Sequence, residues 1–230
     1  MSLLALDIST KTGWSKFVDG QPVLFGVIVN DLDWNTWPYP QNFIEVTDVM
    51  IRRIIAQIDE LQDVDTIVIE ETNKTGRFGS RHSQKILEFL HCELNRRLLL
   101  THSHITVRYV NTSDWRKTLK LSVAETKKLA KPYLKKLDTM KKELAKTTDR
   151  EAKKLLKTQL DLFKQELKDK CILHKIDKKS ISVAYANATF NLNLKKGDND
   201  ISDSLCLGKA FLLGASFLTN KDIFDRGAKK

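Results

Sequence analysis

Leu3-Leu4-Ala5-Leu6-Asp7-Ile8 is an apolar run that contains a single acid, near its end. Such a run predicts a buried strand. Thr66-Ile67-Val68-Ile69-Glu70 has the same form and predicts a second buried strand that ends in a carboxylate. An unpaired charge in apolar surroundings is costly, so both acids need a partner. The carboxyl ends of strands in an open sheet face one crevice, and we expect Asp7 and Glu70 to meet there.

The patterns around these two runs predict a mixed, mainly open α/β sheet covered by helices. Asp19-Gly20 is a hairpin-turn signal between two alternating segments. In chain order the expected elements are strands at 3–8, 13–18 and 23–29, a helix at 43–61, a strand at 66–69, a helix at 86–98 and a strand at 105–110.

A third acidic motif lies near the other end of the chain. Asp200 and Asp203 are three residues apart at the start of a predicted helix, so they share one face of it. If they join Asp7 and Glu70, four carboxylates without interleaved Lys or Arg repel one another. Cations relieve such repulsion, and oxygen ligands select hard ions such as Mg²⁺ or Mn²⁺.

Simpler interpretations compete for some of these acids. Asp200 and Asp198 both stand where a helix N-cap is wanted. Strand alternation turns Glu71 away from Glu70, toward solvent or a loop. A calcium-binding EF-hand is excluded, because its sixth position would be Asp203 instead of Gly and its twelfth Lys209 instead of Glu.

Composition excludes the disordered, collagen-like and low-complexity classes. The chain has 230 residues, of which 41% are hydrophobic and 30% charged. It contains no run of about 18 apolar residues, so we expect no membrane segment. Leu3 already belongs to a strand, which leaves no room for a targeting peptide before it. Three scattered cysteines form neither a disulfide framework nor a CxxC site, which suits a reducing, cytoplasmic location.

The net charge of +10 comes from one block. Residues 116–179 hold 21 Lys or Arg and 9 Asp or Glu, a net of +12. Such a surface is either a solvated helical face or a site for a polyanion such as DNA. Apolar spacing of three and four, with start signals at Ser122/Glu125 and Thr148/Glu151, predicts an antiparallel helical hairpin. We therefore expect a core at 1–121 and 178–220, an inserted lysine-rich arm at 122–177 and a polar tail at 221–230.

An acidic pocket beside a basic surface is what a metal-dependent nuclease requires, because two metal ions activate a water and stabilise the leaving oxygen. Three motifs also resemble those of the RuvC-type Holliday-junction resolvases of the ribonuclease H-like superfamily. The motifs are Leu4-Ala5-Leu6-Asp7-Ile8-Ser9 with Thr12-Gly13-Trp14, Ile67-Val68-Ile69-Glu70, and Asp200-Ile201-Ser202-Asp203-Ser204-Leu205. The basic arm makes the chain look like elaborated viral or phage members.

The resemblance implies a five-stranded sheet of order 3-2-1-4-5 and a homodimer that pairs through the helix at about 80–100. It implies that Asp7, Glu70, Asp200 and Asp203 are catalytic and hold two Mg²⁺ ions, with Mn²⁺ as a substitute. Each subunit would cut one of two symmetry-related strands of a four-way junction with a metal-activated water. The products would carry 5′-phosphate and 3′-hydroxyl ends.

Candidate DNA contacts come from the loop after Glu70 and from the basic block. Family members place a base-stacking aromatic soon after the catalytic Glu, and Phe78 is the first aromatic here. Lys178 or Lys179 could supply the basic residue near the active site. The full candidate set is Lys74, Arg77, Phe78, Arg81, Arg116, Lys117, Lys127, Lys128, Lys178 and Lys179.

Two other function classes stay open at this point. Asp7 to Gly13 also resembles the phosphate-binding turn of actin-like ATPases and sugar kinases, although those need a second glycine-rich turn and a longer chain. A non-catalytic protein that binds junctions or RNA would use the acids only as caps.

Overall fold

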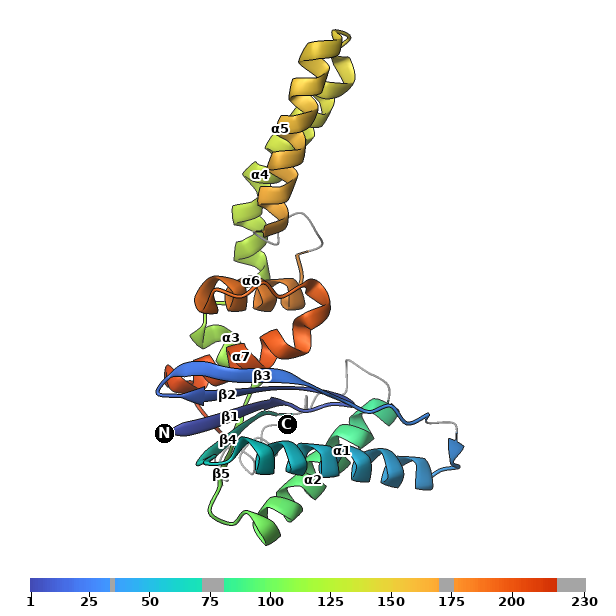
Figure 1. Cartoon of the computed structure of the whole chain (residues 1–230), viewed down its shortest axis with the longest axis vertical. Helices are drawn as coiled ribbons and strands as arrows, with labels where there is room; N and C mark the ends of the chain where they lie inside the picture. Colours follow the sequence, from blue (N-terminus) through green and yellow to red (C-terminus); the bar gives the residue numbers. More distant parts are fainter. Residues whose placement is uncertain (34–35, 72–80, 170–175, 219–230) are drawn as a thin grey trace, which may run out of the picture. The chain divides into compact units, whose positions relative to one another are not determined.

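The computed structural model describes residues 1–33, 36–71, 81–169 and 176–218, with side chains of the helix at 81–101 from residue 84 onward. Its residues fall into two compact units (Figure 1). The sheet unit comprises residues 1–120 and 200–230, and the helical unit comprises residues 121–199. The polar tail predicted at 221–230 lies outside the described residues.

The sheet unit has five strands in the order β3-β2-β1-β4-β5, which confirms the predicted order. β1 pairs antiparallel with β2 and parallel with β4, and β4 pairs parallel with β5. Asp19 and Gly20 have φ of 49° and 82°, the conformation that an Asp-Gly hairpin turn needs. The strands are β1 (Ser2–Asp7), β2 (Lys11–Val18), β3 (Gln21–Val29), β4 (Thr66–Glu70) and β5 (Thr106–Val110).

Helices cover both faces of this sheet (Figure 1). α1 (Gln41–Leu61) and α2 (Arg81–Thr101) lie on one face, where their buried residues join Leu4 and Leu6 of β1 in one core. α7 (Asn199–Leu212) lies on the opposite face. Gly208 of α7 is so close to Phe17 of β2 that a Cβ added there would lie 2.3 Å from the ring. α7 is thereby held flat against the sheet.

The helical unit contains the predicted hairpin of α4 (Val123–Lys146) and α5 (Arg150–Asp169). At 1.5 Å per residue these helices are about 36 and about 30 Å long. Their shared core consists of Leu137, Leu160, Phe163 and Leu167, all buried, as the apolar spacing predicted.

Of the two predicted helix starts, one is confirmed and one is wrong. The Ser122 side chain accepts a hydrogen bond from the Glu125 amide at 3.3 Å, which confirms the first start. At the second start the cap is Asp149, whose carboxylate accepts from the Ala152 amide at 2.7 Å, so the choice of Thr148 was wrong. Asp149 is the better cap because its carboxylate carries a full charge at the positive end of the helix.

The boundary between the units differs from the expected one. α6 (Lys178–Phe190) and the short helix η2 (Lys196–Asp198) were assigned to the core but belong to the helical unit. The reason is apolar packing: Ile176 and Ile181 bury themselves against Ala130 of α4. The sheet unit resumes only at Asp200. In the described part of the chain, no helix is both long and apolar enough to cross a membrane.

Candidate active site

Asp7 and Glu70 occupy neighbouring strand ends. Leu6 of β1 pairs in parallel register with Ile69 of β4, so the acid that follows each apolar run emerges at the same edge of the sheet. The residues before each acid are almost all fully buried, which fixes both strands in the centre of the sheet. The two acids therefore lie at adjacent strand ends, and after burial the charge of Glu70 is the next cause that raises the pKa of Asp7.

α7 brings the third and fourth acids to this edge. Gly13 is the cross-strand partner of Asp7, and a Cβ on Gly13 would lie 1.9 Å from the Asp200 carbonyl oxygen. Only the absence of a side chain at Gly13 lets the first turn of α7 approach so closely. Asp200 and Asp203 lie three residues apart in that turn, with side chains only 18% and 13% exposed.

A short helix that was not expected from the sequence holds Glu70. α3 (Thr112–Thr118) begins after Asn111, whose side chain accepts a hydrogen bond from the Ser113 amide. The Thr112 hydroxyl donates to Oε1 of Glu70. The fully buried Trp115 donates from its indole Nε1 to Oε2 of Glu70 at 2.9 Å. Both carboxylate oxygens of Glu70 therefore have a donor from α3.

Two cations also lie among the acids, and neither was expected there. Arg116 of α3 places Nη2 3.2 Å from Oδ1 of Asp203, and both side chains are nearly buried. The Arg116 guanidinium also stacks over the Trp115 ring, 4.1 Å from its centroid. Lys11, at the start of β2, places Nζ 3.0 Å from Oδ2 of Asp200, with 48% of its side chain exposed.

These cations do not neutralise the cluster. Four carboxylates face two positive charges, so an excess of two negative charges remains when all are ionised. Burial, followed by the charges of Glu70, Asp203 and Asp200, raises the pKa of Asp7 well above its usual value. Burial also raises the pKa of Glu70, against the lowering effect of its hydrogen bonds from Thr112 and Trp115. The site favours either a proton or an additional cation.

The chemistry of the donors fits a hard divalent cation, since every donor is a carboxylate oxygen. Across the described ranges, however, no three His, Cys, Asp or Glu side chains already form a set of metal ligands. The oxygens of Asp200, Asp203 and Glu70 are engaged by Lys11, by Arg116 and by the two α3 donors. The expectation of an acid cluster free of basic neighbours was therefore wrong.

The alternative roles for nearby acids are confirmed only in part. Asp198 is not an N-cap: it is the last residue of η2, and its carboxylate accepts a hydrogen bond from the amide of the N-cap residue Lys195 at 2.7 Å. Asp200 lies inside α7, which begins at Asn199. Glu71 accepts from the side-chain amide of Asn111 at 3.0 Å, which makes it a loop contact.

The structure places only part of the predicted DNA-contact set. Arg116 points at Asp203 and is 12% exposed, so it belongs to the acid cluster and not to the surface. Lys74, Arg77 and Phe78 lie outside the described residues, as does the side chain of Arg81. The remaining five are at least partly exposed: Lys117 in the sheet unit, and Lys127, Lys128, Lys178 and Lys179 in the helical unit.

Solved structures of Holliday-junction resolvases are among those that are similar to this chain. RuvC of T. thermophilus in complex with a Holliday junction substrate aligns with a TM-score of 0.54 at 8% identity, over 95% of this chain and 99% of that chain. The chain has the RuvC fold. A second structure of Thermus thermophilus RuvC gives 0.54 at 9% identity, over 95% and 100%. The yeast mitochondrial Holliday junction resolvase Ydc2 gives 0.43 at 11% identity, over 98% and 85%. No protein-family model and no curated protein sequence matches the chain.

The RuvC fold confirms the resemblance drawn from the three acidic motifs at the level of architecture. Its mixed five-stranded sheet of order 3-2-1-4-5 is the ribonuclease H-like arrangement that was expected. The four acids are the four that the motifs singled out, and they belong to β1, β4 and α7.

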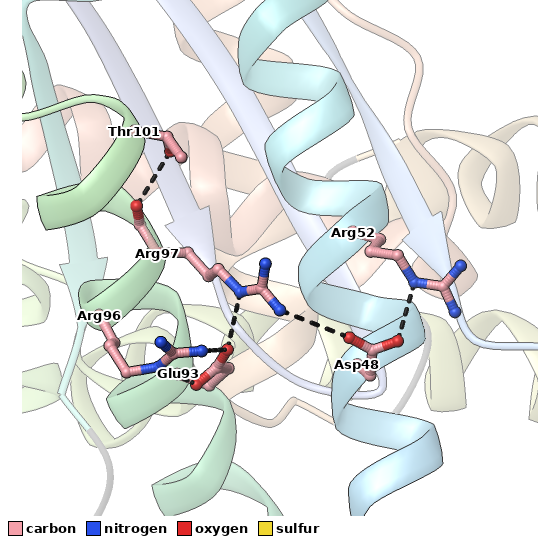
Figure 2. A network of polar contacts seen from close by, with 6 residues as sticks. All are labelled: Asp48, Arg52, Glu93, Arg96, Arg97 and Thr101. Carbon is pink, nitrogen blue, oxygen red and sulfur yellow. Dashed lines mark hydrogen bonds and ion pairs between the residues drawn. The ribbon is translucent and has the colours of Figure 1, made fainter.

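A second surface feature lies between α1 and α2, apart from the acids. A groove of about 420 Å³ is lined by Tyr39, Pro40, Phe43, Ile44, Thr47, Asp48, Phe89, Glu93 and Arg97. Beside it runs an ion-pair network (Figure 2), in which Asp48 contacts Arg52 at 2.9 Å and Glu93 contacts Arg96 at 2.7 Å and Arg97 at 2.8 Å. Hydrogen bonds from Arg96 and Arg97 lower the pKa of Glu93 to about 2.

Proposed function

We propose that this protein is a metal-dependent endonuclease that cuts branched DNA, chiefly four-way junctions. The observation that carries the proposal is the convergence of Asp7, Glu70, Asp200 and Asp203 at one sheet edge of a RuvC fold. The similar RuvC structure is described as a complex with a Holliday junction substrate. Acids drawn together from distant parts of the chain, at the cost of repulsion, are typical of a catalytic site rather than of helix capping.

The four acids are proposed to hold Mg²⁺, or Mn²⁺ in its place, with two ions per site. When bound, such ions supply a nucleophilic water and stabilise the leaving oxygen of a phosphodiester. Burial, followed by repulsion from the other three acids, raises the pKa of Asp7, and a bound divalent cation would offset that repulsion. The products are proposed to be 5′-phosphate and 3′-hydroxyl ends.

Lys11 and Arg116 have different proposed roles, because their surroundings differ. Arg116 is nearly buried and stacked on Trp115, so it fixes Asp203 in place. The Lys11 ammonium is half exposed at the rim of the acid cluster, on a flexible stem. It is therefore suited to exchange Asp200 for a phosphate of the incoming DNA strand.

The decisive experiment compares wild type with Asp7→Asn on a synthetic four-way junction. The amide keeps the size of the side chain but removes the charge, so the variant should bind the junction and leave it uncut. A panel of branched and linear DNAs, with Mg²⁺, Mn²⁺ or a chelator, then defines the substrate and the products on sequencing gels. Undiminished cleavage by Asp7→Asn would contradict the assignment of Asp7 as a metal ligand.

The same panel, together with a nucleotide-binding titration, separates the two other function classes. An actin-like ATPase or sugar kinase would bind nucleotide in a titration and would cut no DNA. A non-catalytic binding protein would bind the junction and leave it intact under every metal condition. No specific observation favours either class: the sequence lacks the second glycine-rich turn that the ATPase fold needs, and capping does not require four acids at one sheet edge.

The helical arm is proposed to grip a duplex arm of the junction without reading its sequence. Its lysines at 127, 128, 135, 136, 141, 142, 153 and 154 are the candidates for this role. Replacing them with Gln should lower the slope of log affinity against log salt by about 0.9 for each phosphate that is no longer neutralised. Replacing them with Arg is the matched control, since it preserves the charge. An unchanged slope in the Gln variant would make these lysines a solvated face.

We also propose a homodimer that pairs through α2 and the groove beside it. Ile44 and Phe89 are 60% and 56% exposed there, next to charges of both signs. Exposed apolar side chains beside charges of both signs suit a two-fold interface, in which the same surface meets itself. Phe89→Glu should shift the protein from dimer to monomer in sedimentation equilibrium. Leu129→Glu, at an exposed apolar position of α4, is the control; dissociation by that change alone would place pairing in the arm.

A further inference from the structure

Helix α3 contacts the acid cluster at two acids that come from different elements. Thr112 and Trp115 donate to Glu70 at the end of β4, and Arg116 pairs with Asp203 of α7. The helix is itself fixed, because Trp115 is 0% exposed and Asn111 caps its start. α3 is therefore built into the sheet unit as a support for the site.

The two donors to Glu70 are specific in direction. Trp115 donates to one carboxylate oxygen and Thr112 to the other, so the carboxylate plane can neither rotate nor tilt without losing a hydrogen bond. Each carboxylate oxygen has two lone pairs, so a single donor to each oxygen does not exhaust its capacity to bind a cation. An acid that served only as a buried structural charge would be expected to pair with a cation, whereas Thr112 and Trp115 are both neutral donors.

We propose that Trp115 and Thr112 are positioning residues that fix the Glu70 carboxylate for metal binding. The proposal rests on the metal-dependent nuclease function proposed above. Groups that orient a metal-ligating side chain typically contribute 10- to 100-fold to metal affinity. Neither residue contacts the metal or the DNA in this role.

The test uses Thr112→Val and Trp115→Phe, singly and together, in the full-length protein. Val has the shape of Thr without the hydroxyl, and Phe retains an aromatic ring without the indole N–H. Mn²⁺ binding is measured directly by electron paramagnetic resonance without DNA, and junction cleavage is measured across Mn²⁺ concentrations. We expect the half-saturating Mn²⁺ concentration to rise about tenfold or more in the double variant. The cleavage rate at saturating Mn²⁺ should fall by much less.

Thr112→Ser keeps the hydroxyl and should bind Mn²⁺ at the wild-type level, which separates the hydrogen bond from packing. Glu70→Gln provides the reference for loss of the ligand. If Glu70→Gln weakens Mn²⁺ binding and the double variant binds like wild type, the positioning role is refuted and the nuclease proposal survives. If Glu70→Gln also binds Mn²⁺ like wild type, Glu70 is not a metal ligand and the positioning role is refuted; if wild type then also cuts no junction with Mn²⁺, the nuclease proposal is refuted as well. A double variant that loses only thermal stability likewise overturns the positioning role.

Discussion

α7 lies so close to β2 at Gly13 that Gly13→Ala should disturb both the fold and the acid cluster. The added Cβ would lie 1.9 Å from the Asp200 carbonyl oxygen and 2.3 Å from its carbon. Ordinary van der Waals contact begins near 3.4 Å, so the backbone at Asp200 must move by roughly 1.5 Å. Because the obstacle is backbone, no rotation of a side chain can relieve it.

The expected cost has two parts. Overpacking of this kind destabilises a protein by about 1–3 kcal/mol, which urea unfolding measures directly. A misplacement of about 1 Å in a catalytic group costs about 100-fold in rate, so junction cleavage should fall by at least that factor. The loss of cleavage should exceed the loss of folded protein, because the displaced element carries Asp200 and Asp203.

Gly197→Ala is the matched control. Gly197 lies three residues before Asp200, yet nothing lies within 4 Å of the position of its Cβ. This variant should unfold within about 0.5 kcal/mol of wild type and cleave normally. If Gly13→Ala behaves in the same way, α7 does not lie against β2 and the geometry of the acid cluster is wrong.

Three further predictions concern stability alone, each measured by urea unfolding. Burial lowers the pKa of His91 to about 4, below the unfolded value of 6.5, so wild type should lose about 3 kcal/mol as pH falls from 6.5 to 4. His91→Phe should lack this part of the acid sensitivity, and an identical pH profile would refute the assignment. Arg116→Met leaves Asp203 nearly buried beside other acids and should lower the free energy of unfolding by about 3–5 kcal/mol. The double variant with Asp203→Asn should regain much of this stability. If it regains none, Arg116 and Asp203 are not coupled. Asp149→Ala should cost about 1 kcal/mol through loss of the α5 cap, and no effect would argue against that cap.

The sheet and the four acids were predictable because burial marks them in the sequence. An acid at the end of a continuous apolar run, as at Asp7 and Glu70, is held at the margin of the buried core, where an unpaired charge is costly and a partner is expected. The spacing of Asp200 and Asp203 fixed their common helix face in the same way. The unit to which α6 belongs could not be predicted, because its apolar residues indicate a buried face but not the element that covers it. Only tertiary packing of Ile181 against Ala130 decides between the two units.

The residues of α3 that hold Glu70 and Asp203 could not be predicted from the sequence. Thr112–Thr118 is a single short helix with one large apolar residue, Trp115, so it has no periodic pattern to detect. Its N-cap residue, Asn111, is equally common in turns. Lys11 was missed for a related reason, since a lysine in a predicted turn is normally solvated.

Counting charged residues along the sequence did not show where the charge of Arg116 lies in the fold. It was counted with the basic block at 116–179, yet its guanidinium lies among the acids of the sheet unit, at 3.2 Å from Asp203. The charge that a DNA strand can reach in that block is therefore one less than the sequence count. The charge of the acid cluster is also less negative than four carboxylates suggest.

Placing Arg116 among the acids lowers both the positive charge of the basic block and the negative charge of the acid cluster. The difference in charge between the two surfaces is therefore smaller than the sequence suggests. The acid cluster nevertheless keeps a negative charge. The Lys11 side chain is half exposed, so solvent screens its ion pair with Asp200. The pKa of Asp7 also stays raised although Arg116 lowers it. The four carboxylates still outnumber the two cations beside them, which supports the proposal that a divalent ion binds there.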